Sequence, residues 1–356
     1  MRVLHILNHI QKIGNGIVNV AVDLACLQAQ AGYEVSVISG GGEYETLLAQ
    51  YEVTHFRLNQ TRSWRNLARA ASQYRAIVQQ VQPDIVHAHM MTGAVLARSL
   101  KLWSQYGLVA TVHNEVQESA KLMGLADRVI AVSQAVSQSM QHRGIPPRKL
   151  RVVTNGTLES PRVGSLTDCP PVCLQRPAIT TVAGMNSRKG IAELIVAFEK
   201  IALDFPEAHL YLVGHGPEKE QFQVQARQTR VASRIHFEGF QTDPRAYLLS
   251  TDVFVLASHR EPFGLAISEA REVGCAIVAS RVDGIPEVLE QGRAGLLVPP
   301  GDSQALAATI AALLKNSTQL NYWKAQAQKN LDWLNVTRVV TETLGVYGEL
   351  KPGIPT

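Results

Sequence analysis

Short apolar runs alternate with helix-like segments along most of the 356-residue chain. This alternation predicts parallel sheets, because each parallel strand needs a crossover, usually a helix, before the next one can begin. A polar, proline-rich stretch at 158–177 divides the runs into two series. We therefore expect an α/β protein of two doubly wound domains that face a cleft.

The two series set the expected domain boundaries. Residues 1–160 should form the first domain, 161–177 the linker and 178–332 the second domain. The amphipathic stretch that opens 333–356 should be a helix that packs back on the first domain. The expected strands are 3–7, 34–39, 85–88, 108–112, 128–132 and 150–153, then 179–183, 209–213, 234–237, 252–257, 276–279 and 295–298. The expected helices include 16–30, 135–141, 191–203 and 304–315.

Two glutamates stand eight positions apart in the sequence Glu-Pro-Phe-Gly-Leu-Ala-Ile-Ser-Glu at 261–269. Pro262 disfavours helical backbone at Glu261 and is itself well suited to the first position of a helix. We therefore expect Glu261 in a loop after the 252–257 strand, and Glu269 about two turns into the next helix. Both carboxylates would then face the ligand crevice of an α/β sheet.

A pair of cations, Arg188 and Lys189, follows the first strand of the second series, in the turn that runs from Gly184 to Gly190. Such a pair is more often a solvated surface feature. Here the cations stand beside the first amides of a helix, and the acidic pair is expected in the neighbouring crevice. This placement favours binding of a diphosphate. The cations could neutralise a leaving diphosphate in place of a metal. The sequence has no Asp-x-Asp motif or His/Asp cluster of metal-binding type, so we expect no metal.

Glycine turns follow strands in both halves. The first, Gly14-Asn-Gly16, differs from the dinucleotide-binding pattern because Asn19 replaces its third glycine. The second strand also ends in serine and glycines instead of an acidic residue, so a dehydrogenase is not expected. Gly16 still allows an anion or sugar hydroxyls to approach a helix N-terminus. Gly214 and Gly216 form a similar turn, whose alternative interpretation is a simple tight turn.

Three histidines follow or end strands of the first domain. His113 comes after the strand at 108–112, where a site residue is credible and a packing role is common. His87 and His89 end a neighbouring strand, and we expect them to be mainly structural and to line the floor of the cleft.

Positive charge is concentrated in the first half. Residues 1–165 contain 16 Lys/Arg and 10 Asp/Glu, a net charge of +6, whereas 166–356 contain 18 and 20, a net charge of −2. Between 53 and 83 there are no acidic residues. The arginines there are Arg57, Arg62, Arg65, Arg69 and Arg75, and the apolar residues at helical spacing are Trp64, Leu67, Ala71, Tyr74, Val78 and Val81. This pattern predicts an amphipathic helix with a basic outer face. It could be an ordinary surface helix, or could contact an anionic lipid surface or an anionic acceptor.

Location is predicted from the start of the chain and from its cysteines. No apolar run reaches the ~18 residues that suggest a membrane span. The first residues read as a strand and not as a signal peptide. The four cysteines match no zinc or disulfide spacing, which favours free thiols in a cytoplasmic protein.

In their order and spacing, these features resemble the retaining glycosyltransferases of family 4, which have the GT-B fold of two Rossmann-like domains. The resemblance covers nearly the whole chain. Its most specific part is the E-x7-E motif, Glu261-Pro-Phe-Gly-Leu-x3-Glu269. The supporting motifs are the first glycine turn, Gln82-Pro-Asp-Ile-Val-His-Ala-His89, Val153-Thr-Asn-Gly156, Arg188-Lys-Gly190, Val213-Gly-His-Gly-Pro217, Phe237-Glu-Gly239, Asp283-Gly-Ile-Pro-Glu287 and Gly295-Leu-Leu-Val-Pro-Pro-Gly-Asp302.

The resemblance implies roles for the matching residues. Glu261 would lie by the donor sugar, and Glu269 would bind the ribose hydroxyls of the nucleotide. Lys189, with Arg188, would bind the diphosphate, and His113 would lie near the reacting sugar. The implied catalytic residues are Glu261, Lys189, Arg188 and His113. The implied donor-binding residues are Gly16, Gly214, Gly216, Phe263, Gly264, Leu265 and Glu269.

One position departs from the family pattern. Many members carry arginine directly after the glycine that ends the first strand of the second domain, and this chain has Met185 there. Arg188 is therefore the candidate for the second cation of the diphosphate site.

The resemblance implies a metal-independent enzyme that moves a hexose-type sugar, preferably from a UDP-sugar, with retention of configuration. The acceptor would be a hydroxyl of a glycolipid, polysaccharide or small molecule, bound mainly by the first domain. Peripheral contact with an anionic inner membrane face is a further expectation, and no cofactor or nucleic acid is expected. Two alternatives remain open: a GT-B-shaped sugar-nucleotide epimerase and a non-catalytic nucleotide-sugar-binding subunit.

Overall fold

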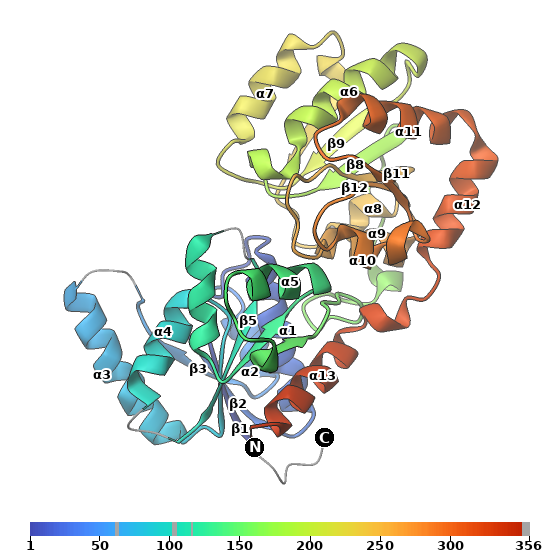
Figure 1. Cartoon of the computed structure of the whole chain (residues 1–356). Coiled ribbons are helices and arrows are strands. Elements are labelled where there is room, and N and C mark those ends of the chain that lie inside the picture. The colour runs from blue at the N-terminus through green and yellow to red at the C-terminus, as the bar shows by residue number, and fades with distance from the viewer. Residues whose placement is uncertain (61–63, 102–104, 115–116, 351–356) are drawn as a thin grey trace. The chain divides into compact units, whose positions relative to one another are not determined.

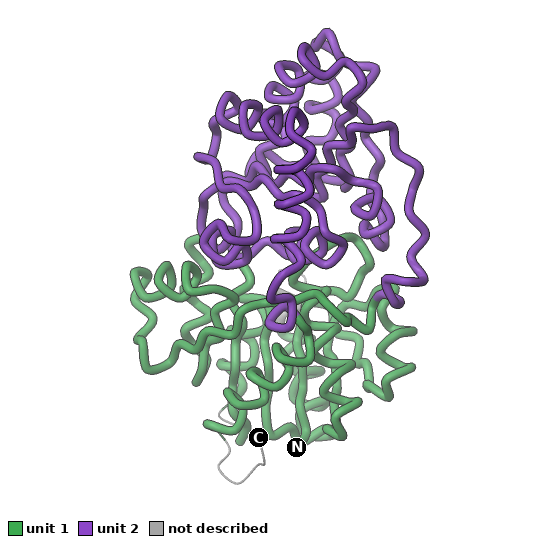
Figure 2. The backbone as a smooth tube through the Cα atoms, turned by 90° about the vertical axis from the view of Figure 1, so that its right-hand side faces the viewer, with its two compact units in different colours: residues 1–162, 335–356 green, residues 163–334 purple. Residues whose placement is uncertain are grey.

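The computed structural model describes residues 1–60, 64–101, 105–114 and 117–350. The chain divides into two compact units (Figure 2). Unit 1 contains residues 1–162 and 335–356, and unit 2 contains residues 163–334. Each unit has one parallel sheet with helices packed around it (Figure 1). The predicted α/β architecture of two doubly wound units is therefore confirmed.

Unit 1 has a sheet of order β3-β2-β1-β4-β5-β6-β7. Its strands are β1 (Arg2–Ile6), β2 (Glu34–Ser39), β3 (Thr54–Arg57), β4 (Ile85–Ala88), β5 (Gly107–Val112), β6 (Arg128–Ala131) and β7 (Leu150–Val152). Its α-helices are α1 (Gly16–Gln30), α2 (Glu45–Gln50), α3 (Trp64–Val81), α4 (Met91–Leu100), α5 (Gln134–His142) and α13 (Val336–Gly348).

Unit 2 has a sheet of order β10-β9-β8-β11-β12-β13. Its strands are β8 (Ala178–Val182), β9 (His209–Val213), β10 (Ile235–Gly239), β11 (Val253–Leu256), β12 (Ala276–Ser280) and β13 (Leu296–Val298). Its α-helices are α6 (Ile191–Asp204), α7 (Lys219–Gln228), α8 (Arg245–Leu248), α9 (Leu265–Val273), α10 (Ile285–Val288), α11 (Ser303–Lys315) and α12 (Ser317–Ala327).

Both sheets reverse their strand order beside the first strand of the unit. In unit 1 the chain passes outward from β1 to β2 and β3, then returns to the other side of β1 at β4. In unit 2 it passes from β8 to β9 and β10 and returns at β11. Ligands of open α/β sheets bind outside the carboxyl ends of the strands at such a switch point. The loops after β1, β4, β8 and β11 are therefore the places to look for a site.

The strand β3 is absent from the sequence prediction, which counted Arg57 among the arginines of the 53–83 stretch without assigning it to a strand. Arg57 instead ends β3, an edge strand, where its guanidinium contacts Glu45 at 3.0 Å. An edge strand with half-exposed side chains lacks the apolar run that marks the central strands. The predicted amphipathic helix itself is α3, with Tyr74 and Val78 buried and Arg69 and Arg75 exposed. Arg62 lies outside the described residues, as does the side chain of Arg65.

The last helix, α13, belongs to unit 1, as predicted. It packs beside α1, and the short parallel bridge between Leu158 and Asn335 joins its start to the segment after β7. Arg338 donates to the carbonyl of Thr154 at 2.7 Å. The side chain of Tyr347 is fully buried, which places its hydroxyl inside the unit beside His87.

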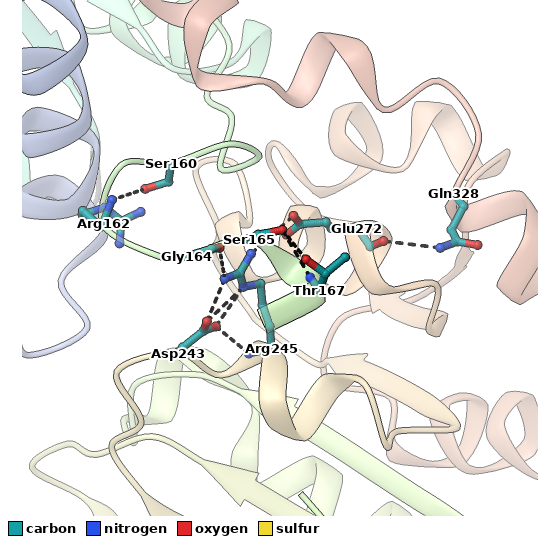
Figure 3. Close-up of polar contacts among 9 residues, drawn as sticks. All are labelled: Ser160, Arg162, Gly164, Ser165, Thr167, Asp243, Arg245, Glu272 and Gln328. Carbon is teal, nitrogen blue, oxygen red and sulfur yellow. Dashed lines mark hydrogen bonds and ion pairs between the residues drawn. The ribbon is translucent and has the colours of Figure 1, made fainter. Parts of the chain in front are cut away.

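The segment expected to be a linker is hydrogen-bonded to unit 2. Arg245 is 5% exposed and donates both to Asp243 and to the carbonyl of Gly164, as Figure 3 shows. Further along, Val172 donates its amide to the carbonyl of Ala246 at 2.9 Å. Residues 163–177 therefore follow the surface of unit 2 and are grouped with it.

A buried arginine ties α9 to the end of α12. Arg271 is completely buried and donates to the carbonyls of Val288, Ala327 and Lys329, at 2.7, 3.0 and 2.6 Å. Its charge is paired with Glu290 at 2.7 Å. Because all four partners are satisfied by one side chain, the helix that carries Glu269 is held firmly in unit 2.

Replacing Arg271 by methionine should lower the free energy of unfolding by about 3–5 kcal/mol, because the largely buried Glu290 carboxylate loses its charge partner and three carbonyls lose a donor. Arg293→Met is the control, since Arg293 approaches the same Glu290 at 3.7 Å with a side chain that is 79% exposed. We expect the control to cost less than about 1 kcal/mol. Urea unfolding would measure both, and equal losses would contradict this account.

Candidate functional site

The loop between β8 and α6 carries the two predicted cations. Ser187, Arg188 and Lys189 form a 3₁₀ turn, and Gly190 follows with a φ of +65°. A Cβ at Gly190 would lie 1.9 Å from the carbonyl oxygen of Ala257, so only glycine permits this packing. The loop is thus pressed against the carboxyl end of β11, and α6 begins directly after it.

The neighbouring loop, between β11 and α9, holds Glu261. Its backbone amide donates to the Asp283 carboxylate at 2.9 Å, and its carbonyl accepts from the amide of Gly284 at 3.0 Å. A Cβ at Gly284 would lie 2.2 Å from the carbonyl oxygen of Pro262. Asp283 and Gly284 therefore fix Glu261 from behind. The sequence carries a signal for this role, because the motif that begins at Asp283 follows β12, the strand next to β11.

The side chains of Lys189 and Glu261 form an ion pair. The two residues come from loops that follow adjacent strands, β8 and β11, at the switch point of the sheet. The Glu261 side chain is 10% exposed and that of Lys189 is 16% exposed. Ser258 lies within 3.4 Å of the same carboxylate oxygen. The structure thus brings together one predicted cation and one predicted carboxylate in a partly desolvated position.

Helix α9 begins at Leu265, three residues later than the sequence predicted. Gly264, with a φ of +100°, is the N-cap, and Pro262 lies before the helix. Glu269 is consequently the fifth residue of α9 and little more than one turn from its start, not two. The correction has a physical reason: the left-handed backbone at Gly264 cannot continue a helix that starts earlier.

The start of α9 offers backbone groups and not side chains. Phe263 is 2% exposed, and its ring packs edge-on against Trp333 with centroids 6.2 Å apart. Only the backbone of Phe263 is therefore available to a ligand. The first amides of a nine-residue helix, around Gly264 and Leu265, carry a partial positive charge that favours an anion.

The turn after β9 packs against the turn after β8. A Cβ at Gly214 would lie 2.0 Å from the carbonyl oxygen of Ala183, and one at Gly216 would lie 2.4 Å from that of Met185. Met185, at the position where many family members carry arginine, is completely buried. Its side chain belongs to the core of unit 2, so this position contributes no cation.

In unit 1, Gly16 is the first residue of α1. The side chain of Asn15 caps the helix by accepting from the amide of Ile17 at 3.0 Å, and Gly14 precedes it with a φ of +71°. The first turn of α1 contains no acidic residue. The loop after β1 therefore presents a helix N-terminus at the switch point of the sheet of unit 1.

Four histidines meet in the interior of unit 1. His5 and His87 are fully buried, His89 is 2% exposed and His113 is 9% exposed. Hydrogen bonds connect His5 to His89 at 2.9 Å and His89 to His113 at 3.1 Å. Burial lowers the pKa of His5 to about 4, opposed by the hydrogen bond that His5 donates to the Gln28 oxygen, and lowers the pKa of His113 to about 3. It also holds the pKa values of His87 and His89 well below the usual range.

A polar cavity of about 920 Å³ lies in unit 1 beside the loops after β1, β2 and β3. Its lining is rich in carboxamides and includes two guanidinium groups: Asn8, Gln11, Asn59, Gln60, Gln73, Arg57 and Arg69. Among the described residues that line it there is no carboxylate. The Gln60 side-chain oxygen is buried and has no hydrogen-bond partner in the described part of the chain.

The predicted site residues therefore fall into two groups. Lys189, Glu261 and the start of α9 are gathered in unit 2. Gly16 and His113 belong to unit 1, together with the polar cavity, which no sequence motif marks. None of the helices in the described ranges has both the length and the apolar character that crossing a bilayer requires.

Two family models match this chain. Residues 14–157 match the model described as Glycosyltransferase Family 4, and residues 174–330 match the model described as Glycosyl transferases group 1. The two matches cover most of unit 1 and most of unit 2.

Relatives and solved structures agree with these matches. The chain is 30% identical over 174 residues to the lipopolysaccharide core biosynthesis glycosyltransferase LpsE of Rhizobium meliloti, covering 48% of this chain and 49% of the relative. It therefore spans about half of that relative. It is 27% identical over 301 residues to glycogen synthase of Mycobacterium tuberculosis, a match that covers 76% of this chain and 70% of the relative. The structure of Anabaena Alr3699/HepE in complex with UDP and glucose shares the fold, with a TM-score of 0.82 and 20% identity. The match covers 97% of this chain and 98% of that chain.

The buried histidines predict an acid-sensitive unit 1. Unfolded histidine has a pKa near 6.5, so below that pH the unfolded state binds more protons than the folded state, and stability falls as pH drops toward about 4. Each histidine contributes up to about 1.4 kcal/mol per pH unit in this window.

His87→Phe should therefore make the dependence of unfolding free energy on pH shallower by about one proton. Val86→Ala is the control, because it removes buried volume from the same strand without removing a titrating group. The control should lower stability equally at all pH values. Parallel pH profiles for wild type and His87→Phe in urea unfolding would refute the prediction.

Proposed function

Because the chain belongs to the family 4 glycosyltransferases, we propose that it transfers a hexose-type sugar from a nucleoside diphosphate donor to an acceptor hydroxyl. The observation that carries the proposal is the Lys189–Glu261 pair at the switch point of unit 2. It stands where open α/β sheets bind ligands, with the start of α9 next in the chain after Glu261.

In the proposed reaction, unit 2 binds the donor. Lys189 and Arg188 neutralise the diphosphate as the bond from the sugar to its oxygen breaks. The amides around Gly264 and Leu265 add the partial positive charge of a helix N-terminus. Electrostatic groups that are already in place when charge develops contribute strongly to catalysis. Because these cations take the place of a metal in this proposal, the reaction is metal-independent.

We assign Glu269 to the ribose hydroxyls and Glu261 to the donor sugar. The half-buried position of Glu269, the fifth residue of α9, suits a carboxylate that accepts from hydroxyl groups. Gly214 and Gly216 remain proposed donor-site residues, because their close packing holds the turn after β9 against the turn after β8. UDP is the favoured nucleotide, and the UDP complex of the similarly folded HepE supports that choice.

The proposed stereochemistry is retention, by the front-face route favoured in the family. The leaving phosphate takes the proton of the attacking acceptor hydroxyl, so no protein nucleophile is required. The contact of Glu261 with Lys189 supports this assignment, because a carboxylate held by a cation is a poor nucleophile. In unit 1, Gly16 remains a proposed contact for an anion at the start of α1, and His113 a proposed contact for a sugar hydroxyl.

The cavity of unit 1 is the proposed acceptor site. Its carboxamides suit sugar hydroxyls, and Arg57 and Arg69 suit a phosphate or carboxylate. An acceptor that combines both, such as a phosphorylated glycolipid or a polysaccharide intermediate, fits this lining. The basic surface of α3 would also permit peripheral contact with an anionic membrane.

Neither an epimerase nor a non-catalytic subunit is favoured by the family matches, both of which are to transferases.

Lys189→Ala should lower transfer by about 10²–10³-fold, because a preorganised charge on the leaving group is lost. UDP binding, followed as the thermal shift that the nucleotide causes, should also weaken. Lys200→Ala is the control, since Lys200 is exposed on α6. Circular dichroism would confirm that both variants are folded. Wild-type turnover by folded Lys189→Ala would disprove the phosphate assignment.

Arg69→Gln should reduce transfer of labelled glucose from UDP-glucose into a bacterial lipid extract by about tenfold, the loss of roughly 1.4 kcal/mol of binding. Arg75→Gln, on the same helix but outside the cavity lining, should retain activity. Equal losses in both variants, together with equal losses in sedimentation with anionic liposomes, would instead indicate that α3 acts only as a membrane surface.

A further inference from the structure

A chain of hydrogen bonds runs through the core of unit 1 from α1 to His113. Gln28 on α1 contacts His5 on β1 at 2.9 Å, and His5 contacts His89 just after β4 at 2.9 Å. His89 contacts His113, just after β5, at 3.1 Å. The rings of His5, His89 and His113 are stacked in series, with centroids 5.2 and 5.4 Å apart. Four residues far apart in the sequence thus form one continuous line.

In such a line, one end determines every proton position. A neutral imidazole has one nitrogen that donates and one that accepts, so a ring that donates on one side must accept on the other. The Gln28 amide oxygen faces His5, while its amide nitrogen donates to the hydroxyl of Tyr347 at 3.3 Å. His5 must then carry its proton on Nε2 and accept at Nδ1.

The same rule continues outward. His89 donates from Nε2 to His5 Nδ1, and therefore accepts at its own Nδ1. His113 donates from Nε2 to His89 Nδ1. Its remaining nitrogen, Nδ1, is left without a proton and has no partner in the described part of the chain. His113 is also the most exposed of the four rings.

A side branch satisfies the remaining polar atoms. The Tyr347 hydroxyl donates to Nδ1 of His87 at 2.6 Å, and Nε2 of His87 donates to the Thr111 hydroxyl at 2.6 Å. All rings can therefore be neutral, which agrees with the effect of burial on their pKa values.

The same cluster could be considered as a metal site, because ligand atoms of His5, His87 and His89 lie within 4.8 Å of one another. All six ring nitrogens of these residues already have hydrogen-bond partners at 2.6–3.1 Å. A metal would have to break bonds within a buried network that is otherwise complete. The contacts favour a hydrogen-bond line over a ligand set.

We propose that Gln28, His5 and His89 are positioning residues, which hold His113 as the neutral tautomer protonated at Nε2 and so make Nδ1 a permanent acceptor for a sugar hydroxyl. The sugar contact rests on the proposed function, whereas the tautomer rests on the hydrogen bonds alone. A permanent acceptor would recognise a hydroxyl at one position of the sugar, and it would form no hydrogen bond with an analogue that lacks that hydroxyl. Tyr347, whose hydroxyl accepts from Gln28 at the start of the line, lies on α13.

The first test is histidine ¹⁵N NMR, in which protonated and unprotonated ring nitrogens have clearly separate shifts. Wild-type His113 should show Nε2 protonated and Nδ1 unprotonated at pH 7, before any ligand is added. In His89→Phe, the ring of similar size keeps the packing but removes both bonds, so His113 should lose the single tautomer. His55→Phe is the matched control, because it removes a histidine of β3 whose hydrogen bond goes to Ser39, outside the line, and its His113 signals should match wild type.

The second test compares ligands by calorimetry. His89→Phe should bind UDP like wild type and should bind UDP-glucose about tenfold more weakly, while His55→Phe, which lies outside the line, binds both like wild type. Nδ1 protonation of His113 in wild type, or an unchanged tautomer in folded His89→Phe, would overturn the proposal. So would stoichiometric metal in the purified protein, measured by mass spectrometry. If wild type binds neither UDP nor UDP-glucose, the proposed function fails, and the NMR result still decides the tautomer.

Discussion

The ion pair between Lys189 and Glu261 is the interaction on which the proposed chemistry of unit 2 depends. Charged groups this far from water are stable only when paired, because desolvation otherwise disfavours them. The two loops that carry them are fixed by glycines: Gly190 permits contact with the end of β11, and Gly284 permits contact with the loop at Pro262. A cation and a carboxylate are therefore preorganised before any donor arrives, and little rearrangement is needed to oppose the charge of a leaving diphosphate.

Unit 1 uses a different principle. Its central histidines are neutral, and they fix the direction of each hydrogen bond, since each ring must donate on one side and accept on the other. Through the line of hydrogen bonds, the orientation of the buried Gln28 side-chain amide therefore makes Nδ1 of His113 an acceptor in our proposal. The last helix contributes Tyr347 to this network, so the return of α13 to unit 1 has a chemical consequence as well as a packing one.

The sequence predicts much of this architecture, because strong local signals coincide with tertiary demands. Helix α1 has the predicted bounds, set by the Asn15 cap and an apolar stripe. The edge strand β3 was missed because it has no apolar run to mark it. The place of Glu269 was misjudged because Gly264, and not Pro262, determines where α9 starts. The pairing of His5 with Gln28 and His89 depends on side chains far apart in the chain, and no local pattern encodes it.

Hydrogen–deuterium exchange with and without UDP-glucose tests the central claim most directly. If the donor binds at the switch point of unit 2, the amides of 184–190 and 263–269 should be protected on binding, since those loops carry Lys189 and the start of α9. The same experiment in Lys189→Ala should show little protection at either loop. Protection confined to other parts of the chain, with these two loops exchanging as in the free protein, would contradict the account.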